Sequence, residues 1–516
     1  GGNPPEQVVP NRAADQPRLL AGELFLGQRP YLPGNPCVPP GRGAGDRLTT
    51  SPLALAQEEL AGQEAWLVGG AVRDDLLGRI AASEATDIDL ALPGDAAGAA
   101  EALRRRAGAG VAAFQLSDQF GGWRVAGDGW QVDCIPLQGA TLEEDLRARD
   151  LTVNAIARPL AGGEPIDPTG GIADLGSRTL RMAAPGSFAA DPLRVLRVAR
   201  LAAQLGMEAE PQTLSAARAA APALEGVAAE RVFQELSLLL TGTDPHTGLE
   251  LLGETGAEPV VLPELSALRG VEQTRYHHLD AHGHTLEVVE RVAGLASDPG
   301  PVAGGREDEL VAVLQEPLAD GLTRGEALRW AALLHDIAKP RTRAVSGDGR
   351  VGFPGHDREG ALMARQILGR LRASDRLASY VAAITEAHLL LGFLVHQQPI
   401  DPGMRFDYLD ACDPVEVDVT LLSIADRLAT RGRKADEAIA AHMEVATPML
   451  GAALDWRRDG RPRSPLPGDE LARALELEPG PRLGELLAGV ERAVYTGEVQ
   501  DPDGAVAWAR SALSGT

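Results

Sequence analysis

The chain has 516 residues, too many for one ordinary hydrophobic core, so several domains are expected. Its composition, 44% hydrophobic and 24% charged, is that of a soluble globular protein. We find neither a signal peptide nor an apolar run near the roughly 20 residues that span a bilayer. A cytoplasmic location is therefore predicted. The formal net charge of −24 argues against nucleic-acid binding over the whole surface, because phosphate affinity comes from lysine and arginine. Three widely spaced cysteines predict neither a disulfide framework nor a zinc knuckle.

Two changes of pattern divide the chain. Residues 1–50 are rich in proline and glycine and lack periodicity, so a disordered extension is expected. From residue 51 to 182, short apolar strands alternate with helices, and beyond that helical periodicity prevails. The fold class predicted is an α+β head followed by a mostly helical neck, body and tail. Strands are expected at residues 65–70, 87–92, 121–127 and 130–137, and helices at residues 71–79 and 96–108.

The first motif couples a glycine turn to a pair of carboxylates. Gly69 and Gly70 lie between a strand and a helix, and Arg73 follows one turn into that helix. Such a turn brings backbone N–H groups and a fixed positive charge towards a phosphate. Asp87 and Asp89 then share one face of the strand DIDLAL. Paired carboxylates suit two Mg²⁺ ions in phosphoryl transfer, although Asp-x-Asp alone also fits a soluble strand end.

The second motif is the segment EEDLRARDLTVNAIA. Arg149, Asp150 and Asn154 precede an apolar helical run in it. An amphipathic helix with a solvated charged face explains the segment equally well when it is taken alone.

The third motif begins at Asp191 and Pro192, which predict a helix start. Arg194, Arg197 and Arg200 then recur on one slowly turning face. Capping and surface solvation would explain these residues. The stripe is nevertheless the most concentrated positive one in an acidic chain, and it suits recognition of a triphosphate or of a base edge.

The three motifs, in this order and spacing, resemble the class II tRNA nucleotidyltransferase/poly(A) polymerase family of the DNA polymerase β superfamily. The resemblance runs from Trp66 nearly to the C-terminus, and it implies a DNA polymerase β-like mixed sheet with helices in the head. By this resemblance, Asp87 and Asp89 are catalytic and hold Mg²⁺. The nucleotide-binding residues that it implies are Gly69, Gly70, Arg73, Arg149, Asp150, Asn154, Asp191, Arg194, Arg197 and Arg200.

Asp191 and Arg194 match the base-reading pair of that family. Cytosine and adenine each present an amino donor beside a ring-nitrogen acceptor, whereas uracil and guanine present the reverse order. An accepting carboxylate and a donating guanidinium therefore fit C and A. The family's usual glutamate before this aspartate is Ala190 here.

A histidine-rich set lies in the helical half of the chain. A histidine, a His-Asp doublet on an apolar helix and a distant aspartate, with His356 and His388 between them, resemble the HD phosphohydrolase domain. Imidazole and carboxylate together suit a divalent transition metal or Mg²⁺, and a working site is favoured over a structural relic. The metal ligands that the resemblance implies are His284, His335, Asp336 and Asp426.

The connection after the strand VDCIPL bears on the nucleotide that is added. Only QGAT lies between Leu137 and Leu142, where CCA-adding and A-adding relatives usually hold a longer flexible segment. CC-adding members are similar in lacking it, so we expect CC addition from CTP to the tRNA 3′ end without a nucleic-acid template. The alternatives are a complete CCA-adding enzyme that also uses ATP and, with less support, a poly(A) polymerase. Asp133 in this strand is either a third carboxylate or a solvated residue.

The expected partners are tRNA and CTP, with ATP as a further nucleotide and no membrane. Binding of tRNA by an acidic chain is expected to be weak and sensitive to salt. The predicted regions are the extension over residues 1–50, the nucleotidyltransferase head over 51–182, the helical neck over 183–265, the HD domain over 266–445 and a helical tail over 446–516.

Overall fold

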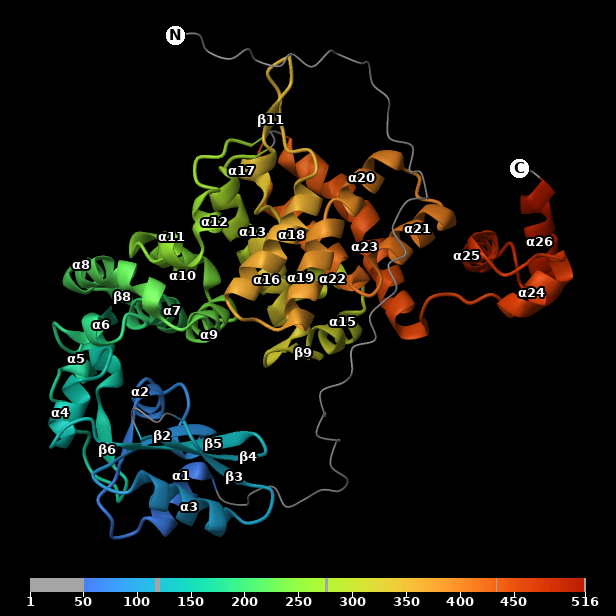
Figure 1. Ribbon diagram of the computed structural model, residues 1–516. Coiled ribbons are helices and arrows are strands. Elements are labelled where there is room, and N and C mark those ends of the chain that lie inside the picture. Colours follow the sequence, from blue (N-terminus) through green and yellow to red (C-terminus); the bar gives the residue numbers. More distant parts are fainter. Residues whose placement is uncertain (1–50, 117–120, 274–276, 433, 515–516) are drawn as a thin grey trace. The chain divides into compact units, whose positions relative to one another are not determined.

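The computed structural model describes residues 51–116, 121–273, 277–432 and 434–514 (Figure 1). The predicted extension over residues 1–50 lies outside this described part. A sheet with helices comes first along the described chain and is followed by helices with a few short strand pairs. The predicted fold class, an α+β head followed by a mostly helical neck, body and tail, is therefore confirmed.

A six-stranded mixed sheet forms the centre of the head, in the order β3-β4-β5-β2-β1-β6. β2 and β5 run parallel, and the other neighbours are antiparallel. All expected strands are present. The two edge strands, β3 and β6, are not expected from the sequence, because their short sequences show no alternation of apolar residues. The strands are β1 (Trp66–Val68), β2 (Asp87–Leu92), β3 (Ala112–Gln115), β4 (Trp123–Gly127), β5 (Trp130–Pro136) and β6 (Ala157–Pro159).

The two faces of this sheet have different roles. Val125, Val132 and Ile88 lie opposite one another across β4, β5 and β2, and each is at most 1% exposed. α3 (Ala96–Ala107) packs against β3, β4 and β5, and α1 (Pro52–Glu59) packs against α3 (Figure 1). Since successive residues of a strand point to opposite faces, Asp87 and Asp89 project from the face away from this core.

Short helices lie between the strands of the head and between the sheet and the neck. Some of them carry or flank the predicted nucleotide-binding residues of the head. They are α2 (Gly70–Leu76), a 3₁₀ turn (Ala82–Glu84), α4 (Leu142–Arg147), a second 3₁₀ turn (Thr152–Asn154), α5 (Gly171–Ser177) and α6 (Ser187–Ala190).

The neck is helical, with one small parallel strand pair that ties it to the preceding segment. α7 contacts α9 and α10, so the neck helices form one packed group. The elements are β7 (Thr179–Leu180) with β8 (Glu208–Ala209), α7 (Arg194–Leu205), α8 (Pro211–Ala220), a 3₁₀ turn (Ala221–Gly226), α9 (Ala229–Leu240), α10 (Pro245–Glu254), α11 (Glu258–Val261) and α12 (Pro263–Ser266).

Two predicted helix positions are wrong. α7 begins at Arg194 and not next to Asp191, because Pro192 and Leu193 form a separate turn. Asp191 Oδ1 accepts the N–H of Leu193 at 3.2 Å, so the side chain caps this turn. The helical run expected after Asn154 is absent from this described segment, since the chain leaves its 3₁₀ turn and enters β6.

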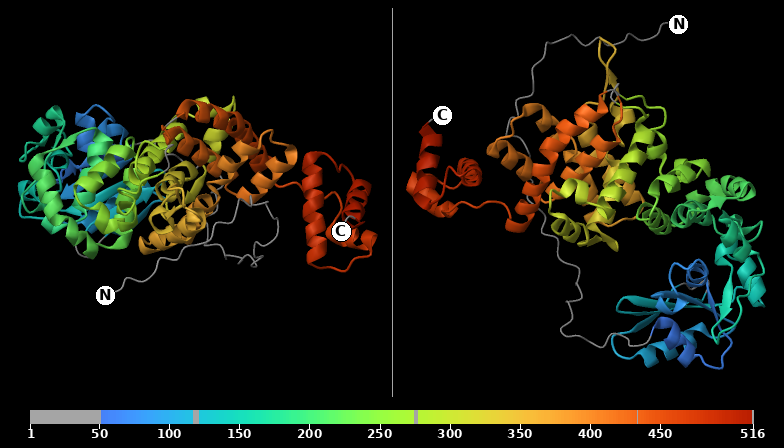
Figure 2. Two further views of the ribbon diagram at one scale, coloured as in Figure 1. Left: turned by 90° about the horizontal axis from the view of Figure 1, so that it is seen from above. Right: turned by 180° about the vertical axis from the view of Figure 1, so that it is seen from behind.

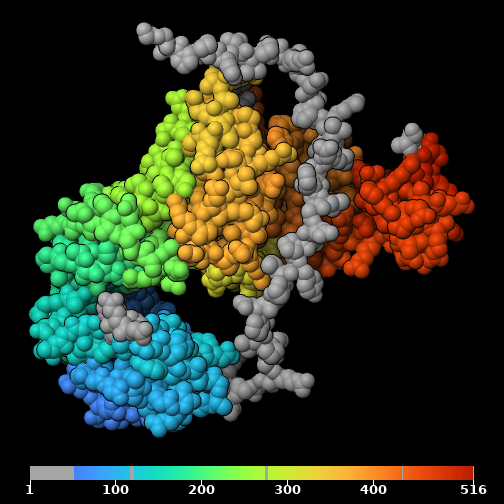
Figure 3. All heavy atoms as spheres, viewed as in Figure 1, coloured from blue at the N-terminus to red at the C-terminus, as the bar shows by residue number. Residues whose placement is uncertain are grey.

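The body contains the predicted HD region. α16 is started by a capping box in which Thr323 and Glu326 each accept the other's backbone N–H. α19 packs against both α16 and α18. The exposed residues of this region belong to the yellow-to-orange surface in Figure 3. The helices are α13 (Ala281–Ser297), α14 (Gly300–Ala303), α15 (Glu307–Leu314), α16 (Arg324–Leu334), α17 (Lys339–Thr342), α18 (His356–Arg370), α19 (Asp375–Ala387), α20 (Leu390–Leu394), α21 (Pro402–Cys412), α22 (Glu416–Ala429) and α23 (Ala435–Asp459).

Two short hairpins and a 3₁₀ turn complete the body. β9 (Pro317–Ala319) pairs with β10 (Leu322–Thr323), and β11 (Ala344–Val345) pairs with β12 (Val351–Gly352). The 3₁₀ turn (Val395–Gln397) follows α20.

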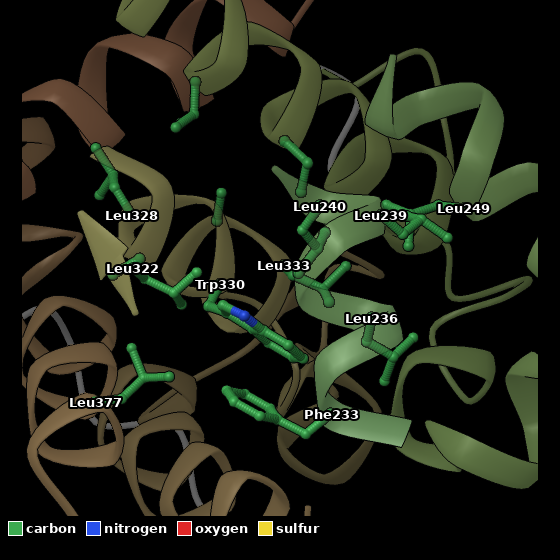
Figure 4. Packing of buried hydrophobic residues seen from close by; sticks show 14 of the residues in the cluster. Phe233, Leu236, Leu239, Leu240, Leu249, Leu322, Leu328, Trp330, Leu333 and Leu377 are labelled. Carbon is green, nitrogen blue, oxygen red and sulfur yellow. The ribbon is translucent and has the colours of Figure 1, made fainter. Parts of the chain in front are cut away.

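Neck and body share an aromatic contact in their common core. Phe233 of α9 stacks on Trp330 of α16 with ring centroids 5.6 Å apart (Figure 4). Trp330 Nε1 donates to Ser237 Oγ of α9 at 3.2 Å, which satisfies the indole N–H inside the core. Leu236 and Leu333 pack in the same cluster. The neck helix α9 is therefore anchored in the HD region.

One body segment is more apolar than the sequence analysis expects. The stretch Asp375–Gln397 contains a window with a mean hydropathy of 1.6, and by length and composition it could cross a membrane. In the structure it is broken into α19, α20 and a 3₁₀ turn, and 56% of the window is buried inside the protein. Such burial is typical of a core helix of a soluble protein.

The C-terminal helices form their own small core (red in Figure 2). They are α24 (Gly468–Leu475), α25 (Pro481–Thr496) and α26 (Pro502–Ser514). The predicted boundary between residues 445 and 446 falls inside the continuous helix α23, so the chain does not change direction there.

A buried ionic cluster joins α11 to α13 and generates a prediction about acid stability. Glu258 is 0% exposed and accepts hydrogen bonds from Ser266 (2.7 Å) and Arg269 (2.9 and 3.0 Å). His282 Nε2 lies 3.0 Å from the same carboxylate. Burial opposes the charge, yet these partners lower the pKa of Glu258 to about 2.

Replacing Glu258 by Gln is expected to lower the free energy of unfolding at pH 7 by about 3 kcal/mol. The depressed pKa stabilises the fold fully above the ordinary glutamate pKa of 4.5, and this contribution is lost as the pH falls towards 2. The difference between Glu258→Gln and the unsubstituted protein, measured by urea unfolding, should therefore shrink between pH 5 and pH 2.

Glu264→Gln is the matched control, because Glu264 pairs with the exposed Arg370 at 2.8 Å. Its cost should stay below about 1 kcal/mol. A difference in free energy of unfolding that stays constant for Glu258→Gln across this pH range would contradict the lowered pKa of Glu258.

Candidate functional site

Three carboxylates meet on one face of the head sheet. Asp87 is exposed and Asp89 is partly buried on β2, and Asp133 on β5 lies directly opposite Asp89. Burial raises the pKa of Asp89 to about 6; Asp133 and Asp87 add to this effect and Arg149 opposes it. A cation between the carboxylates would relieve this repulsion.

Asp133 is not a solvated strand residue, so that alternative is wrong. It is 6% exposed and is bound in a bidentate pair by Arg124 of β4 at 2.7 and 2.8 Å. The pair holds a third carboxylate in place beside Asp89.

The glycine turn leaves space for the carboxylates. Gly69 has φ +71°, and a Cβ at this position would lie 2.9 Å from Asp89 Oδ2 and 3.7 Å from Arg149 Nη1. Any side chain here would therefore press on the carboxylate and strain the backbone. Gly70 begins α2, whose Arg73 is buried.

The predicted phosphate-binding arginine of α2 is engaged within the protein. Arg73 donates to both oxygens of Asp74 at 2.9 Å and to Asn154 Oδ1 at 2.7 Å. Asn154 Nδ2 in turn donates to Asp150 at 3.2 Å. Arg73 thus positions Asn154 in the structure.

A buried ionic network joins the head to the neck. Arg197 of α7 donates to Asp150 at 2.7 Å and contacts Glu235 of α9 at 3.4 Å. Arg200 donates to the other oxygen of Glu235 at 2.7 Å. Burial opposes the charge on Asp150, yet Arg197, the Leu151 N–H and the Asn154 amide hold its pKa well below its ordinary value. Surface solvation therefore does not explain these arginines, which are paired inward.

The predicted base-reading pair lies at the start of α7. Arg194 Nη1 donates to the carbonyl of Arg149 at 3.1 Å and to Ser187 Oγ at 3.0 Å. Asp191 Oδ2 accepts a hydrogen bond from Arg231 of α9 at 2.7 Å. The two residues are electrostatically coupled, since burial lowers the pKa of Arg194 while the negative charges of Asp150 and Asp191 raise it.

The short connection after β5 is held along its length. The Gln138 N–H donates to Asp145 Oδ1 at 3.0 Å, and the Ala140 N–H donates to Glu144 Oε2 at 2.7 Å. Thr141 caps α4 by accepting the Glu144 N–H at 3.3 Å. Residues 137–141 therefore form a capped turn that leads directly into α4.

The donor set on the sheet fits magnesium. Asp87 and Asp89 provide hard oxygen ligands on one face, and the raised pKa of Asp89 reflects its burial together with the neighbouring carboxylates Asp133 and Asp87. Mg²⁺ commonly binds through one or two carboxylates together with substrate phosphates.

The second candidate centre lies among the body helices. It consists of two groups of three side chains, and within each group the potential ligand atoms lie within 4.8 Å of one another. Asp336 links the groups: its Oδ2 faces His335 at 3.1 Å and its Oδ1 faces His356 at 3.3 Å. The groups are His284, His335 and Asp426, and Asp336, His356 and His388.

The histidines present their Nε2 atoms to this centre. The Nδ1 atoms of His335, His356 and His388 lie 2.7, 2.7 and 2.5 Å from backbone carbonyls three residues earlier, which fixes Nδ1 as the donor. Burial lowers the pKa of His388 to about 4, so this imidazole is neutral at neutral pH, as a ligand must be.

Orphaned polar atoms support a metal in this centre. Among the described residues, His284 Nε2 and His335 Nε2 are buried without a hydrogen-bond partner. Asp336 Oδ2 also lacks a partner in hydrogen-bonding geometry, but it forms an ion pair with Lys339 Nζ at 2.5 Å. His284 Nε2 lies 2.9 Å from Asp426 Oδ1 but not in hydrogen-bonding geometry. Buried polar atoms of this kind need a partner, and a divalent cation supplies one. The structure thus gathers the four predicted ligands and adds His356 and His388 to them.

Further residues are found only in the structure. Glu235 joins Arg197 to Arg200, Arg231 contacts Asp191, and Lys339 Nζ lies 2.5 Å from Asp336. No local signal marks the two α9 residues, since a charged helix face is ordinary. His356 and His388 belong to the histidine-rich pattern, but that pattern alone does not distinguish metal ligands from histidines that only lie nearby.

Three family models match the chain. They are described as the poly A polymerase head domain (residues 126–181), the probable RNA and SrmB-binding site of polymerase A (residues 206–268) and the HD domain (residues 282–431).

Similar proteins cover nearly the whole chain. It is 38% identical over 448 residues to an A-adding tRNA nucleotidyltransferase of Deinococcus radiodurans, covering 86% of this chain and 94% of that protein. It is 34% identical over 453 residues to a CC-adding tRNA nucleotidyltransferase of Thermus thermophilus, covering 85% and 91%. Among solved structures, the Bacillus stearothermophilus CCA-adding enzyme in complex with CTP matches with a TM-score of 0.58 at 23% identity, over 90% of this chain and 97% of that one; at this identity the match shows the fold alone.

The two histidine-aspartate groups predict two metal ions in the body. The protein prepared with Mn²⁺ and then desalted should retain about two ions per chain, because Asp336 can bridge two positions. His388→Ala removes a ligand of one group only and should retain about one ion. Elemental analysis by mass spectrometry measures both values.

His246→Ala serves as the control, since His246 lies on α10 beside Glu250 and outside both groups. This variant should retain the same metal as the unsubstituted chain. Equal metal content in His388→Ala would exclude the second position.

Proposed function

Because the chain belongs to the class II tRNA nucleotidyltransferase/poly(A) polymerase family and carries an HD domain, we propose that it adds two cytidines to the tRNA 3′ end from CTP. Pyrophosphate is the leaving group, and no nucleic-acid template is used. The observation that carries the choice of CC is the capped connection over residues 137–141, where relatives that add A usually hold a longer flexible segment.

The rigidity of this connection supports the choice physically. Its backbone N–H groups are bound by Asp145 and Glu144, and Thr141 caps the helix that follows. A segment held at both ends cannot act as a moving element that reshapes the nucleotide pocket between C and A. Addition would therefore stop after the cytidines, and a separate A-adding enzyme would complete the tRNA.

The reaction proposed is in-line attack of the tRNA 3′-hydroxyl on the α-phosphorus of CTP. Asp87 and Asp89 would hold two Mg²⁺ ions, which when bound supply activation of the hydroxyl and neutralisation of the triphosphate. Gly69 keeps the space beside Asp89 free. Arg149 contributes positive charge next to Asp89, as its effect on the pKa of that carboxylate indicates.

Base selection is assigned to Asp191 and Arg194. The carboxylate would accept the amino group of cytosine, and the guanidinium would donate to the ring nitrogen. Arg197 and Arg200 hold the helix that carries this pair through Asp150 and Glu235, and we assign them to the triphosphate side of the same pocket. The acidic chain would bind tRNA at this local cluster of arginines. We expect the protein to be located in the cytoplasm.

A second candidate is addition of the terminal A. It is favoured by the 38% identity to the Deinococcus radiodurans protein named as A-adding, since that similarity exceeds the 34% to the CC-adding protein. A complete CCA-adding enzyme is the third possibility. No feature of the described chain favours a poly(A) polymerase.

The test offers two tRNA transcripts, one lacking CCA and one ending in CC, with CTP or ATP separately. The first should gain two cytidines from CTP. The second should gain A from ATP at least about 100-fold more slowly, because no flexible element adapts the pocket to adenine. Gel analysis of labelled tRNA ends gives the rates, and comparable A addition to the CC-ended tRNA would refute the CC proposal.

Asp87→Asn should lower C addition at least about 1,000-fold in the same assay, since a metal-holding carboxylate is lost. Asp128→Asn, on the exposed turn between β4 and β5, is the control and should retain the full rate.

The body centre supports a second activity, a metal-dependent phosphohydrolase. The supporting observation is the pair of buried ligand groups with orphaned Nε2 atoms. Divalent cations held by these two groups would suit attack of water on a phosphodiester.

We expect hydrolysis of 2′,3′-cyclic nucleotides that depends on added divalent metal and is lost in His335→Ala. C addition by this variant should be unchanged, because His335 lies in the body and not in the head. An unchanged hydrolysis rate in His335→Ala would show that the body centre does not carry this activity.

A further inference from the structure

The carboxylate of Asp191 is held at both oxygens. Oδ1 accepts the N–H of Leu193 at 3.2 Å within the turn before α7. Oδ2 accepts from Arg231 Nη2 of α9 at 2.7 Å. Ala190, the residue before Asp191, has only a methyl side chain and contributes no hydrogen bond to it. The orientation of this carboxylate therefore depends on its own turn and on a helix 40 residues away in the chain.

These two bonds leave Asp191 able to bind a further donor. A carboxylate offers about four lone-pair directions, and the turn and Arg231 use two of them. The remaining directions can accept an exocyclic amino group. A guanidinium partner restricts rotation of the carboxylate, so the free lone pairs keep a fixed direction.

Arg231 is also part of a larger arrangement on α9. Arg231 and Glu235 are four residues apart and so lie on one face of that helix. Glu235 binds Arg197 and Arg200, whereas Arg231 binds Asp191. The same face of α9 thus binds Asp191 before α7 and two arginines within the first half of α7.

We propose that Arg231 is a positioning residue for nucleotide selection, which acts by orienting Asp191 from α9. The proposal rests on the assignment of base reading to Asp191 above. Arg231 does not need to contact the nucleotide. It donates a hydrogen bond to Asp191, which Ala190, the residue before Asp191, cannot do. Its side chain is 51% exposed and that of Asp191 is 28% exposed, so the effect is expected to be moderate.

The test compares Arg231→Ala, Arg231→Lys and the control Arg218→Ala in C addition with CTP and UTP. Arg218 is an exposed neck arginine that donates to the Glu254 carbonyl, away from α7. Arg231→Ala should raise KM for CTP and lower the CTP-over-UTP preference about three- to tenfold, with a smaller change in kcat. Arg231→Lys should restore part of the preference, and Arg218→Ala should leave it unchanged.

A double-mutant cycle separates positioning from tRNA binding. In an Asp191→Ala background, Arg231→Ala should have no further effect on the CTP-over-UTP preference, because its partner is gone. A loss that persists there, or a change in KM for tRNA alone, would overturn the proposal in favour of a direct tRNA contact.

The outcomes also distinguish this inference from the base-reading assignment. If Asp191→Ala leaves the preference unchanged, both fail. If Asp191→Ala abolishes the preference while Arg231→Ala does not alter it, the positioning role alone fails. Equal melting temperatures of the Arg231 and Arg218 variants show that the neck remains folded in the comparison.

Discussion

The proposed nucleotide site depends on one ionic network between head and neck, whose two carboxylates are buried. Asp150 comes from the head, Arg197 from α7 and Glu235 from α9, and they meet with contacts of 2.7 and 3.4 Å. Removing Arg197 would leave the buried carboxylate of Asp150 without its charged partner, and such a loss costs about 3–5 kcal/mol. These charges must therefore stay together. Their contacts fix α7, with Asp191 and Arg194 at its start, relative to the head loop that carries Asp150.

The helix α9 connects this network to the rest of the chain, because one of its faces carries charged side chains and another carries an aromatic side chain. Its charged face holds the arginines of α7, and Phe233 on another face stacks on Trp330 of α16. α16 ends at His335, the first residue of the His-Asp doublet. The head's ionic network and the histidine centre are thus joined through α9 and α16 by packed, hydrogen-bonded contacts.

The histidine centre follows a different principle from the head site. In the head, exposed and partly buried carboxylates lie on the open face of the sheet, and a bound cation would balance their charge. In the body, buried imidazoles are fixed through Nδ1 to nearby carbonyls, so Nε2 points inward before any ligand binds. The first arrangement suits exchange of metals with each nucleotide, and the second suits retained ions.

The sequence by itself determined four of the six strands of the head sheet, the shared face of Asp87 and Asp89, and the residue types of both centres, since these follow from local periodicity and from chemistry that neighbouring residues display. It did not determine which charges are paired. The sequence shows Arg197 and Arg200 as a positive stripe suited to recognition of a triphosphate, but it does not show that they pair with Glu235, which lies more than 30 residues further along the chain. For the same reason it could not assign His356 and His388 to a second ligand group or join Arg231 to Asp191. Those pairings depend on how separate helices pack, and only the tertiary structure decides that.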